Sequence, residues 1–435
     1  ILSSASANTP VILISDVGGA STSDRLTIKD IRVTGATGTG SGIRVTAAAA
    51  ATRSFFRFEG LTVTGNAGSG IAFESTNGTI NDSQVVSCNV CSNFRGVFVA
   101  DTFAGFDGLA ISGSTIKNNS FNGLSVNGVN ANGGFSPTNV SVTSSTFGNN
   151  GQSNNSFQGS GDLSFFLFNG NASLTNVTVN TTGRVPVQFR GRGTDDFSVA
   201  WQPSGTIAIN GLTITGTSDR AGLYVHYYAN VNGMSLSNVN LSGLTSSAAP
   251  FSGFAVTGMV LQHLGATPLA LGNTVFPCQG TGYVGMALFG TGGATADCTT
   301  VFGTNVTHPE KENCIFDVAD FASVGDVVID PSAPLWYLDT DADGFGDPAM
   351  SVRSCTQPVG YVANSGDACP ADPTKSSPGF CGCGNPETDT DGDGTPNCVD
   401  GCPNDPAKIA PGFCGCGNPE TDTDGDGTPN CIDGC

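Results

Sequence analysis

Residues 61–73 read Leu61-Thr-Val-Thr-Gly-Asn-Ala-Gly-Ser-Gly70-Ile-Ala-Phe73. Apolar side chains alternate with threonine at Leu61 and Val63, small and polar residues follow, and a second alternating run starts at Gly70. Alternation with a period of two is typical of a β-strand that buries one face. The stretch therefore predicts a short strand, a turn and a second short strand.

The same two runs return along residues 1–304. Runs like the first begin at Leu26, Leu109, Val140, Val177, Leu212 and Val239, and glycine-led runs begin at Gly42, Gly96, Gly123 and Gly222. A β-sandwich needs longer strands joined by two-residue hairpins. Brief strands that recur after one circuit favour a parallel β-helix, in which inward Val, Ile, Leu and Phe pack against neighbouring coils. We expect Asn, Ser and Thr to form side-chain ladders between the coils.

The recurring Gly-Ile-x-Val and Leu-Thr-Val-Thr-Gly runs resemble the right-handed parallel β-helix families typified by pectate lyases and by many bacterial surface proteins. The resemblance implies an all-β fold, a right-handed parallel β-helix solenoid over residues 1–304. Because many functions share this fold, it does not select one of them.

Net charge narrows the set of partners. The 435 residues include 16 Lys and Arg against 36 Asp and Glu, a formal net charge of -20. A chain this acidic is not expected to bind nucleic acid through its phosphates, and cations are the expected partners. The sequence has no long apolar run, so no membrane-spanning segment is expected.

The C-terminal quarter of the chain differs in composition from the rest. Residues 331–435 hold 17 of the 36 acidic residues and ten of the 15 cysteines. This cysteine density indicates an oxidising compartment, and we expect a secreted or extracellular protein at the cell surface. The expected organisation is a β-helix over 1–304, a junction over 305–334, a degenerate repeat over 335–377 and two full repeats over 378–435, with the repeat array cut short at residue 435.

An internal repeat is the most specific pattern in the sequence. Residues 378–402 recur at 411–435 with one change, Val399 to Ile432, so the period is 33 residues. In each copy, aspartates fall at positions 1, 3, 5 and 12 of a loop with glycine at position 6, which is the spacing of an EF-hand calcium loop. No apolar helical pattern flanks the loops, so an ordinary EF-hand pair is not expected. The alternative is a solvated, Asp-rich linker.

The segment resembles the thrombospondin type 3 repeat, whose Asp-x-Asp-x-Asp-Gly motif and following Cys-Pro are present here. The resemblance implies calcium as the cofactor, held by aspartate side chains, a threonine backbone oxygen, and an asparagine that binds directly or through water. The implied ligands are Asp389, Asp391, Asp393, Thr395, Asn397 and Asp400, and then Asp422, Asp424, Asp426, Thr428, Asn430 and Asp433.

A degenerate copy precedes the two full repeats. It begins at Asp339, and its twelfth position is Met350 instead of an acid. Alignment on the shared Cys-Pro points to Asp367 as the missing ligand, which puts an insertion between the two halves of the site. The candidate ligands are Asp339, Asp341, Asp343, Phe345, Asp347 and Asp367.

Residues 331–435 contain few apolar side chains, so burial cannot be what folds this segment. We expect calcium ions and disulfides to order it into a stiff stalk. The cysteines of each Cys-Gly-Cys unit are too close to pair with each other, so each should reach a neighbouring cysteine. The predicted disulfide-forming residues are Cys381, Cys383, Cys398, Cys402, Cys414, Cys416, Cys431 and Cys435.

The β-helix offers one cluster of aromatic and charged side chains. If Val187 and Phe189 point inward, Gln188 and Arg190 point outward, and the next coil turns Tyr224 outward. Such a patch can bind a glycan, contact a partner, or be an ordinary exposed cluster. Its members are Gln188, Arg190, Asp195, Asp196, Tyr224, His226 and Tyr228.

Catalysis on a polysaccharide is a further, less favoured role for this cluster, and no catalytic residue is predicted. Asp162 is isolated from other acids in the sequence. Cys88 and Cys91 have no thioredoxin-like context, so they are expected to form a local disulfide or two stacked core thiols.

These features predict an extracellular structural or adhesin-like protein, with a β-helix head on a calcium-stiffened repeat stalk. Its expected partners are itself, through assembly into a fibre or surface matrix, or cell-surface glycans. The alternative is a secreted polysaccharide lyase or glycoside hydrolase on a β-helix scaffold, which is the less favoured of the two.

Overall fold

The computed structural model divides the chain into two compact units, Ile1–Asp330 and Pro331–Cys435. We name them the solenoid unit and the C-terminal unit. For some strand residues, among them 190 and 226–229, the structure describes the backbone alone. It describes every other residue except 5, 16–18, 20, 48–51, 76–78, 102–104, 128–137, 152–160, 167, 169, 183–184, 191–205, 219–220, 230–233, 247–254, 264–268, 277–282, 290–293, 297–300, 303–314, 318–326, 330–332, 355–356 and 435.

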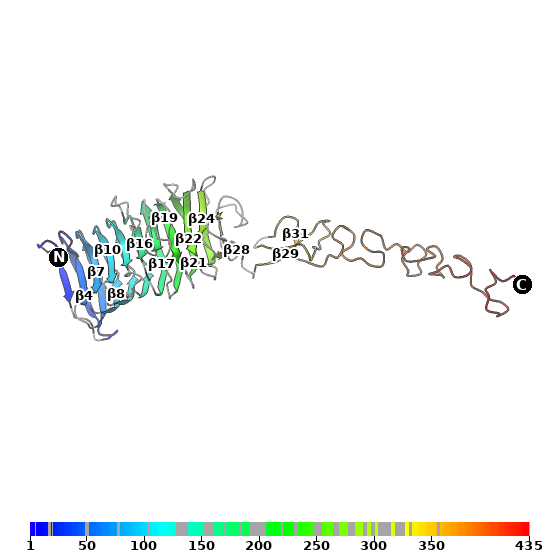
Figure 1. The fold of residues 1–435 in the computed structure, drawn as a ribbon, viewed down its shortest axis with the longest axis horizontal. Helices are drawn as coiled ribbons and strands as arrows, with labels where there is room; N and C mark the ends of the chain where they lie inside the picture. Colours follow the sequence, from blue (N-terminus) through cyan, green and yellow to red (C-terminus); the bar gives the residue numbers. More distant parts are fainter. Residues whose placement is uncertain are drawn as a thin grey trace. The chain divides into compact units, whose positions relative to one another are not determined.

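The solenoid unit is a parallel β-solenoid, in which short strands stack coil upon coil (Figure 1). In the described part of the unit, one parallel sheet has 11 strands: β1 (Ile12–Ser15), β4 (Ile43–Ala47), β7 (Ser69–Ser75), β10 (Arg95–Asp101), β13 (Asn122–Asn127), β16 (Gly161–Phe166), β18 (Val185–Arg190), β20 (Leu223–Ala229), β22 (Ala255–His263), β24 (Tyr283–Phe289) and β27 (Ile315–Asp317).

The second sheet of the solenoid has 17 strands among the residues described: β2 (Leu26–Lys29), β3 (Arg32–Thr34), β5 (Thr52–Glu59), β6 (Thr62–Thr64), β8 (Thr79–Val86), β9 (Asn89–Cys91), β11 (Phe106–Ser112), β12 (Thr115–Lys117), β14 (Thr138–Thr143), β15 (Thr146–Gly148), β17 (Ala172–Thr182), β19 (Ile207–Ser218), β21 (Met234–Ser246), β23 (Leu269–Phe276), β25 (Ala294–Ala296), β26 (Val301–Phe302) and β28 (Val327–Ile329). The residues that the structure describes form no helix, and so none that could span a membrane.

Equivalent apolar residues of successive coils stack to form the core. Ile43 is in register with Ile71, and Ile71 with Val97. All three side chains are fully buried. Burying one such side chain contributes roughly 1.5–3 kcal/mol, so the repeated alternation adds a stabilising layer with every coil. The prediction of a parallel β-solenoid is confirmed.

The glycine that begins each second run is required by close packing between coils. A Cβ at Gly70 would lie 2.9 Å from the backbone oxygen of Gly96. At Gly123 it would lie 2.6 Å from the backbone oxygen of Asp162. A methyl group at either position would push adjacent coils apart, which explains the glycine of the Gly-Ile-x-Val motif.

A ladder of buried asparagines runs through the turns of successive coils. Nδ2 of Asn66 donates to Oδ1 of Asn93 at 2.8 Å, and Nδ2 of Asn93 donates to Oδ1 of Asn119 at 3.2 Å. Asn119 donates in the same way to Asn150 at 2.8 Å. Because each amide satisfies its neighbour, these polar side chains are buried at low cost. The expected side-chain ladders are confirmed: this one is buried, and exposed asparagines such as Asn171 and Asn139 also bond between coils, at 2.9 Å.

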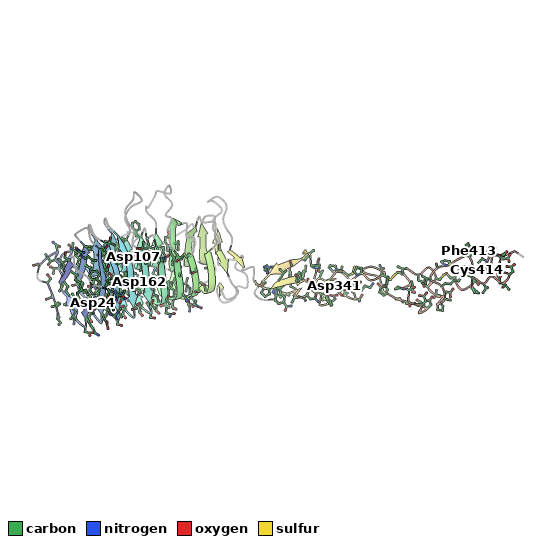
Figure 2. The ribbon with its side chains drawn as sticks, turned by 90° about the horizontal axis from the view of Figure 1, so that it is seen from below. Asp24, Asp107, Asp162, Asp341, Phe413 and Cys414 are labelled. Atoms are coloured by element: carbon green, nitrogen blue, oxygen red, sulfur yellow. A yellow bond between two sulfur atoms is a disulfide. The ribbon has the colours of Figure 1, made fainter. Side chains whose placement is uncertain are left out.

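Asp162, whose place in the solenoid unit is labelled in Figure 2, is fully buried and bonds to the last asparagine of this ladder. Its Oδ1 accepts hydrogen bonds from Nδ2 of Asn150 at 2.7 Å and from the Asn150 backbone nitrogen at 3.2 Å. Burial raises the pKa of Asp162 to about 7, although hydrogen bonds from Asn150 and Thr181 act to lower it. The acid that looked isolated in the sequence is therefore a structural part of the ladder.

Cys88 and Cys91 are both free thiols, so a local disulfide between them is wrong. Cys88 is buried, and its Sγ donates to the backbone oxygen of Phe58 at 3.4 Å. Burial raises the pKa of Cys88 to about 11, which makes it unreactive. Cys91 is only half-buried and bonds Oγ1 of Thr64, so the two thiols do not stack in the core.

The solenoid continues past residue 304, into the segment expected to be a junction. Strand β27 pairs in parallel with β24, and β28 pairs in parallel with β25. Their apolar runs are only two or three residues long, too short for the period of two to be recognised in the sequence.

The C-terminal unit begins with a three-stranded antiparallel sheet. The central strand β29 (Leu335–Leu338) pairs with β30 (Ser351–Arg353) and β31 (Tyr361–Val362). Turns and bends make up most of the remaining described residues. Among the described apolar residues of this unit, only Ala333, Cys369 and Cys402 are fully buried. Where the structure describes this unit, its apolar residues form no continuous core, as expected.

Candidate metal centre

Each aspartate-rich loop is folded by hydrogen bonds from its own backbone to its first aspartate. In the middle loop, Oδ1 of Asp389 accepts from the Gly392 nitrogen at 2.8 Å, and Oδ2 accepts from the Gly394 nitrogen at 2.9 Å. Gly394 has a φ of +92°, which a side chain would disfavour, so position 6 requires glycine. Asp339 and Asp422 accept the equivalent bonds in the first and last loops.

The next two aspartates of each loop converge on the first. In all three loops, one carboxylate oxygen from each of three aspartates lies within 4.8 Å of the others. The three triplets are Asp339, Asp341 and Asp343; Asp389, Asp391 and Asp393; and Asp422, Asp424 and Asp426.

A fourth aspartate completes the first and the middle loop. Asp367 is 1% exposed and Asp400 is 7% exposed. Oδ1 of each accepts from the backbone nitrogen of the cysteine two residues later, Cys369 or Cys402, at 2.7 Å. Oδ2 of each is buried without a hydrogen-bond partner. Asp367 therefore has the same position in the first loop that Asp400 has in the middle loop, although an insertion separates Asp367 from the rest of its loop.

Several other carboxylate oxygens of these loops are also buried without a hydrogen-bond partner. Both carboxylate oxygens of Asp341, and Oδ2 of Asp391 and of Asp393, are buried without a hydrogen-bond partner. Leaving a buried acceptor unpaired costs roughly 1–3 kcal/mol, and more when the group is charged. A cation would satisfy these oxygens, and carboxylate oxygens are the ligands that hard divalent cations prefer. The first and middle loops can therefore hold a metal cation.

The charges of the converging carboxylates act on one another. Desolvation raises the pKa of Asp341, and the negative charges of Asp343 and Asp367 raise it further. The pKa of Asp391 is raised in the same way, with the charge of Asp400 among its causes. These shifts show that the fourth aspartate lies near enough to the triplet for their charges to repel one another. A cation shared by the four carboxylates would offset this repulsion.

Asn397 braces the middle loop from within. Its Oδ1 accepts from the Thr390 backbone nitrogen at 3.0 Å, and its Nδ2 donates to Oγ1 of Thr390 at 2.6 Å. Asn430 makes the same two bonds to Thr423 in the last loop, at 3.0 and 2.6 Å. Each asparagine thus fixes the first turn of its loop, and whether it binds the ion directly or through water stays a prediction.

The residues at position 7 turn the backbone back toward the triplet. The Thr395 nitrogen donates to Oδ1 of Asp393 at 2.7 Å, and Thr428 and Phe345 make the equivalent bond at 2.8 Å. Asp347 accepts from the Ala349 nitrogen at 2.8 Å, in a turn of its own.

The last loop has the same hydrogen bonds but more exposure to solvent. Asp424 and Asp426 are exposed, whereas Asp391 and Asp393 are partly buried. Asp433, the counterpart of Asp400, is also partly exposed. The last loop therefore offers the carboxylates without the buried, unpaired oxygens of the other two.

A lysine–glutamate ion pair precedes each full loop. Nζ of Lys375 lies 2.6 Å from Oε1 of Glu387, and Nζ of Lys408 lies 2.7 Å from Oε1 of Glu420. Each lysine also donates to a backbone oxygen, that of Gly382 at 3.0 Å in the first pair. The sequence analysis missed these pairs. The sequence feature that could have predicted them is a lysine and a glutamate that recur with the period of the repeat, in a segment with almost no other basic residue.

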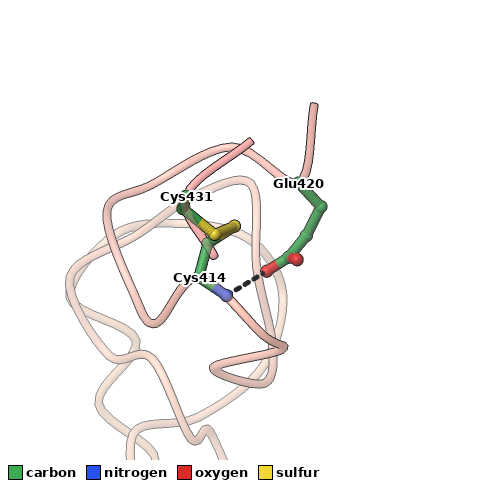
Figure 3. A group of neighbouring side chains, drawn as sticks. All are labelled: Cys414, Glu420 and Cys431. Atoms are coloured by element: carbon green, nitrogen blue, oxygen red, sulfur yellow. Dashed lines mark hydrogen bonds between the residues drawn. A yellow bond between two sulfur atoms is a disulfide. The ribbon is translucent and has the colours of Figure 1, made fainter. Parts of the chain in front are cut away.

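Cys414, Glu420 and Cys431 also lie close together, with one potential ligand atom of each within 4.8 Å of the others (Figure 3). The two cysteines form a disulfide, and Oε1 of Glu420 accepts from the Cys414 backbone nitrogen at 3.0 Å. Sulfur atoms in a disulfide are not thiolate ligands, so this group is a structural support for the last loop.

Among the residues that the structure describes, four disulfides bind the repeats into a chain of overlapping loops: Cys369–Cys383, Cys381–Cys398, Cys402–Cys416 and Cys414–Cys431. In each Cys-Gly-Cys unit, one cysteine is bonded to a preceding cysteine and the other to a following one. As expected, the two cysteines of a unit do not pair with each other. Cys369 was not among the predicted residues, and Cys435 lies outside the described residues. Cys369–Cys383 and Cys402–Cys416 are equivalent bonds, so the disulfide pattern of the repeat includes Cys369.

The predicted patch on the solenoid is not an exposed surface where the structure describes it. Val187 and Phe189 are in the core, and Gln188 and Tyr224 are register partners on the opposite face. Their side chains are nonetheless 1% and 3% exposed. Alternation along a strand predicts which face of the sheet a side chain lies on, but it does not predict whether other residues cover that face. Asp195 and Asp196, and the side chains of Arg190, His226 and Tyr228, lie outside the described part of the chain.

Another place on the solenoid gathers aromatic and charged side chains. A cleft of about 380 Å³ is lined in part by Arg44, Glu74, Phe94, Arg95 and Phe98. The guanidinium carbon of Arg95 lies 4.8 Å from the ring centroid of Phe94 and 4.5 Å from that of Phe98. Nε of Arg44 lies 2.9 Å from Oε2 of Glu74. Sequence analysis missed this cleft because its members come from separate coils.

No protein-family model matches the chain, and no curated protein is significantly similar to it. The fold and the cysteines define its class: an all-β protein with a parallel β-solenoid and a disulfide-bonded C-terminal unit. The four disulfides indicate an oxidising or extracellular environment.

Proposed function

We propose that this chain is a secreted structural protein whose C-terminal unit is made rigid by calcium ions and presents the solenoid unit at the cell surface. The observation that carries the proposal is the buried, unpaired Oδ2 of Asp367 and of Asp400, each beside an aspartate triplet. A folded protein seldom buries a charged acceptor without a partner, and a bound cation is the partner that fits a set of carboxylates.

Calcium fits these loops better than magnesium does. Calcium accepts six to eight oxygen ligands in a flexible geometry, whereas magnesium demands a near-ideal octahedron and usually keeps several waters. Aspartates at positions 1, 3, 5 and 12, with a backbone oxygen at position 7, supply an irregular oxygen set of that kind. The resemblance to thrombospondin type 3 repeats supports the same choice.

Ion binding would supply the order that burial cannot. The C-terminal unit has 17 acidic residues against three basic ones, so its charges repel one another. An ion in each loop offsets that repulsion and fixes the loop, while the disulfides limit the conformations of the segments between loops. The result is a stiff calcium-dependent stalk.

The solenoid unit supplies the surface that the stalk presents, with cell-surface glycans or further copies of the chain as partners. The cleft around Phe94 and Phe98 supports the glycan role, because the guanidinium, carboxylate and hydroxyl groups that line it can hydrogen-bond to sugar hydroxyls. The polysaccharide-enzyme alternative has less support, because Gln188 and Tyr224 are buried and not presented to a substrate.

Calcium titration of the full chain by isothermal calorimetry tests the proposal. We expect one ion for each of the three aspartate triplets, little competition from magnesium at equal concentration, and a middle-loop affinity at least about tenfold weaker in Asp400→Asn. Asp24→Asn, at an exposed aspartate of the solenoid unit, is the control and should titrate as the unchanged protein does. Absence of calcium binding at millimolar concentration would overturn the proposal, as would an Asp400→Asn titration identical to that of the control.

A further inference from the structure

The three-stranded sheet of the C-terminal unit is built around the first aspartate loop. Strand β29 runs directly into Asp339, the first residue of the loop. Strands β30 and β31 both lie in the insertion, between the loop and Asp367. The loop and the fourth aspartate are therefore the two ends of the segment that forms the outer strands.

Backbone hydrogen bonds connect the loop, the sheet and Asp367 directly. The Asp339 nitrogen donates to the Gly360 oxygen at 2.9 Å, and the Asp347 nitrogen donates to the Leu338 oxygen at 2.9 Å. The Asp367 nitrogen donates to the Gly346 oxygen at 3.2 Å. Movement of Asp367 away from the loop would break the last of these bonds.

Among the described residues, this sheet has few other stabilising contacts, such as the bond from Arg353 Nη1 to the backbone oxygen of Ala333 at 2.9 Å. Its strands are four, three and two residues long, and none of their side chains is fully buried. The disulfides that the structure describes in this unit begin at Cys369, after the sheet. A small sheet without a core is marginal in water, so an added crosslink decides whether it forms.

We infer that ion binding in the first loop and formation of the three-stranded sheet are one coupled equilibrium, with Asp367 as the residue that joins them. This inference rests on the proposed calcium function. The second, independent sign of a ligand is Asp367 itself, which is 1% exposed and whose Oδ2 is buried without a hydrogen-bond partner. An ion shared by Asp367 and the triplet closes the insertion into a ring and removes the repulsion that would open it.

The fluorescence emission of Trp336 can report on this equilibrium. It lies in β29, is partly buried, and its Nε1 donates to the backbone oxygen of Ser354 at 2.9 Å. The chain has two tryptophans, so Trp201→Phe leaves Trp336 as the sole reporter. Arg353, in β30, gives a second signal, because it is the only lysine or arginine between residues 331 and 374 and hence the only tryptic site there.

The experiment follows Trp336 emission and tryptic cleavage at Arg353 in the full-length Trp201→Phe chain during a calcium titration from EGTA. We expect calcium to shift the emission to shorter wavelength and to protect Arg353, both with one midpoint. Asp367→Asn should move that midpoint at least about tenfold higher. Asp400→Asn, the same change in the middle loop, should weaken one calorimetric site and leave the Trp336 midpoint within about twofold.

The outcomes separate this inference from the proposed function. If calorimetry shows calcium bound while Trp336 emission and Arg353 cleavage are the same in EGTA, the coupling is wrong and the calcium function stands. If no calcium binds, the proposed function and the inference fail together. If Asp400→Asn moves the Trp336 midpoint as far as Asp367→Asn does, Asp367 is not the specific link. Should Asp367→Asn fail to fold, the titration of the Trp201→Phe chain decides the question.

Discussion

The two units of this protein reach a defined structure by opposite means. In the solenoid unit, apolar residues such as Ile71 and Val97 stack in register and are fully buried. In the C-terminal unit, large apolar side chains such as Phe380 and Phe413 are 78% and 76% exposed. Its contacts are disulfides, ion pairs and backbone bonds to carboxylates. The comparison teaches that one chain can combine a unit stable by burial with a unit whose order depends on its ionic and redox surroundings.

The largest effect should come from the same substitution placed in each unit. Phe165 is fully buried and stacks on Phe189, with ring centroids 4.6 Å apart. Phe165→Ala should destabilise the solenoid by about 3–5 kcal/mol, because it leaves a cavity. Phe413→Ala should change stability by less than about 0.5 kcal/mol. Urea midpoints from far-ultraviolet circular dichroism measure both, and equal effects would remove the contrast between the units.

Removal of one disulfide should affect the C-terminal unit alone. The Cys381–Cys398 bond joins residues separated by 17 positions. Cys381→Ala with Cys398→Ala should cost about 3 kcal/mol by chain entropy and should expose the amides of the middle loop to hydrogen exchange. The solenoid amides should be unchanged and serve as the internal control. Unchanged protection in the middle loop would show that the disulfide contributes no order there.

A pH effect should appear in the solenoid unit, through Asp162. Burial raises the pKa of Asp162 to about 7 in the folded protein, whereas an unfolded aspartate has a pKa near 3.9. The folded state therefore binds the extra proton between those values, and the stability this provides is lost as pH rises through 7. Urea unfolding of the solenoid should be easier at pH 8 than at pH 5, by an amount on the order of 2 kcal/mol.

The matched variant for this pH effect is Asp162→Asn, which retains Oδ1 as the acceptor for Asn150 and removes the ionisable group. Its solenoid stability should vary little between pH 5 and 8. If the variant keeps the pH dependence of the unchanged chain, Asp162 is not its source.

The smallest effect should come from the ion pairs of the C-terminal unit. Lys408 bridges to Glu420 at 2.7 Å, but the glutamate is one-third exposed. Lys408→Met should cost less than about 1 kcal/mol, as solvent-exposed ion pairs do. Proteolysis of the calcium-loaded chain should therefore proceed nearly as before. A large gain in cleavage would mean that the pair positions the last loop more strongly than its exposure suggests.

Much of the fold follows from local sequence patterns. The alternation at Leu61 and Val63, together with the glycine at Gly70, predicts the solenoid because the period of two and the close approach of coils are properties of a few residues. The spacing of aspartates from Asp389 likewise places three carboxylates in one tight loop. Asp367 could be proposed because the Cys-Pro that follows it anchors the alignment.

The features that sequence analysis missed depend on contacts between distant residues. The burial of Gln188 and Tyr224 depends on what covers the outer face of a strand, which alternation does not encode. The role of Asp162 depends on meeting Asn150 inside the coil. The bond between Cys369 and Cys383 could not be chosen from the several pairings that cysteine spacing allows.

The most direct test of this account is hydrogen exchange of the whole chain, with disulfides intact, in calcium and in excess EGTA. The account predicts that amides of residues 339–434 lose protection in EGTA while the stacked strands of the solenoid keep theirs. Equal protection of the C-terminal unit in both conditions would contradict it, because that unit would then be ordered without ions.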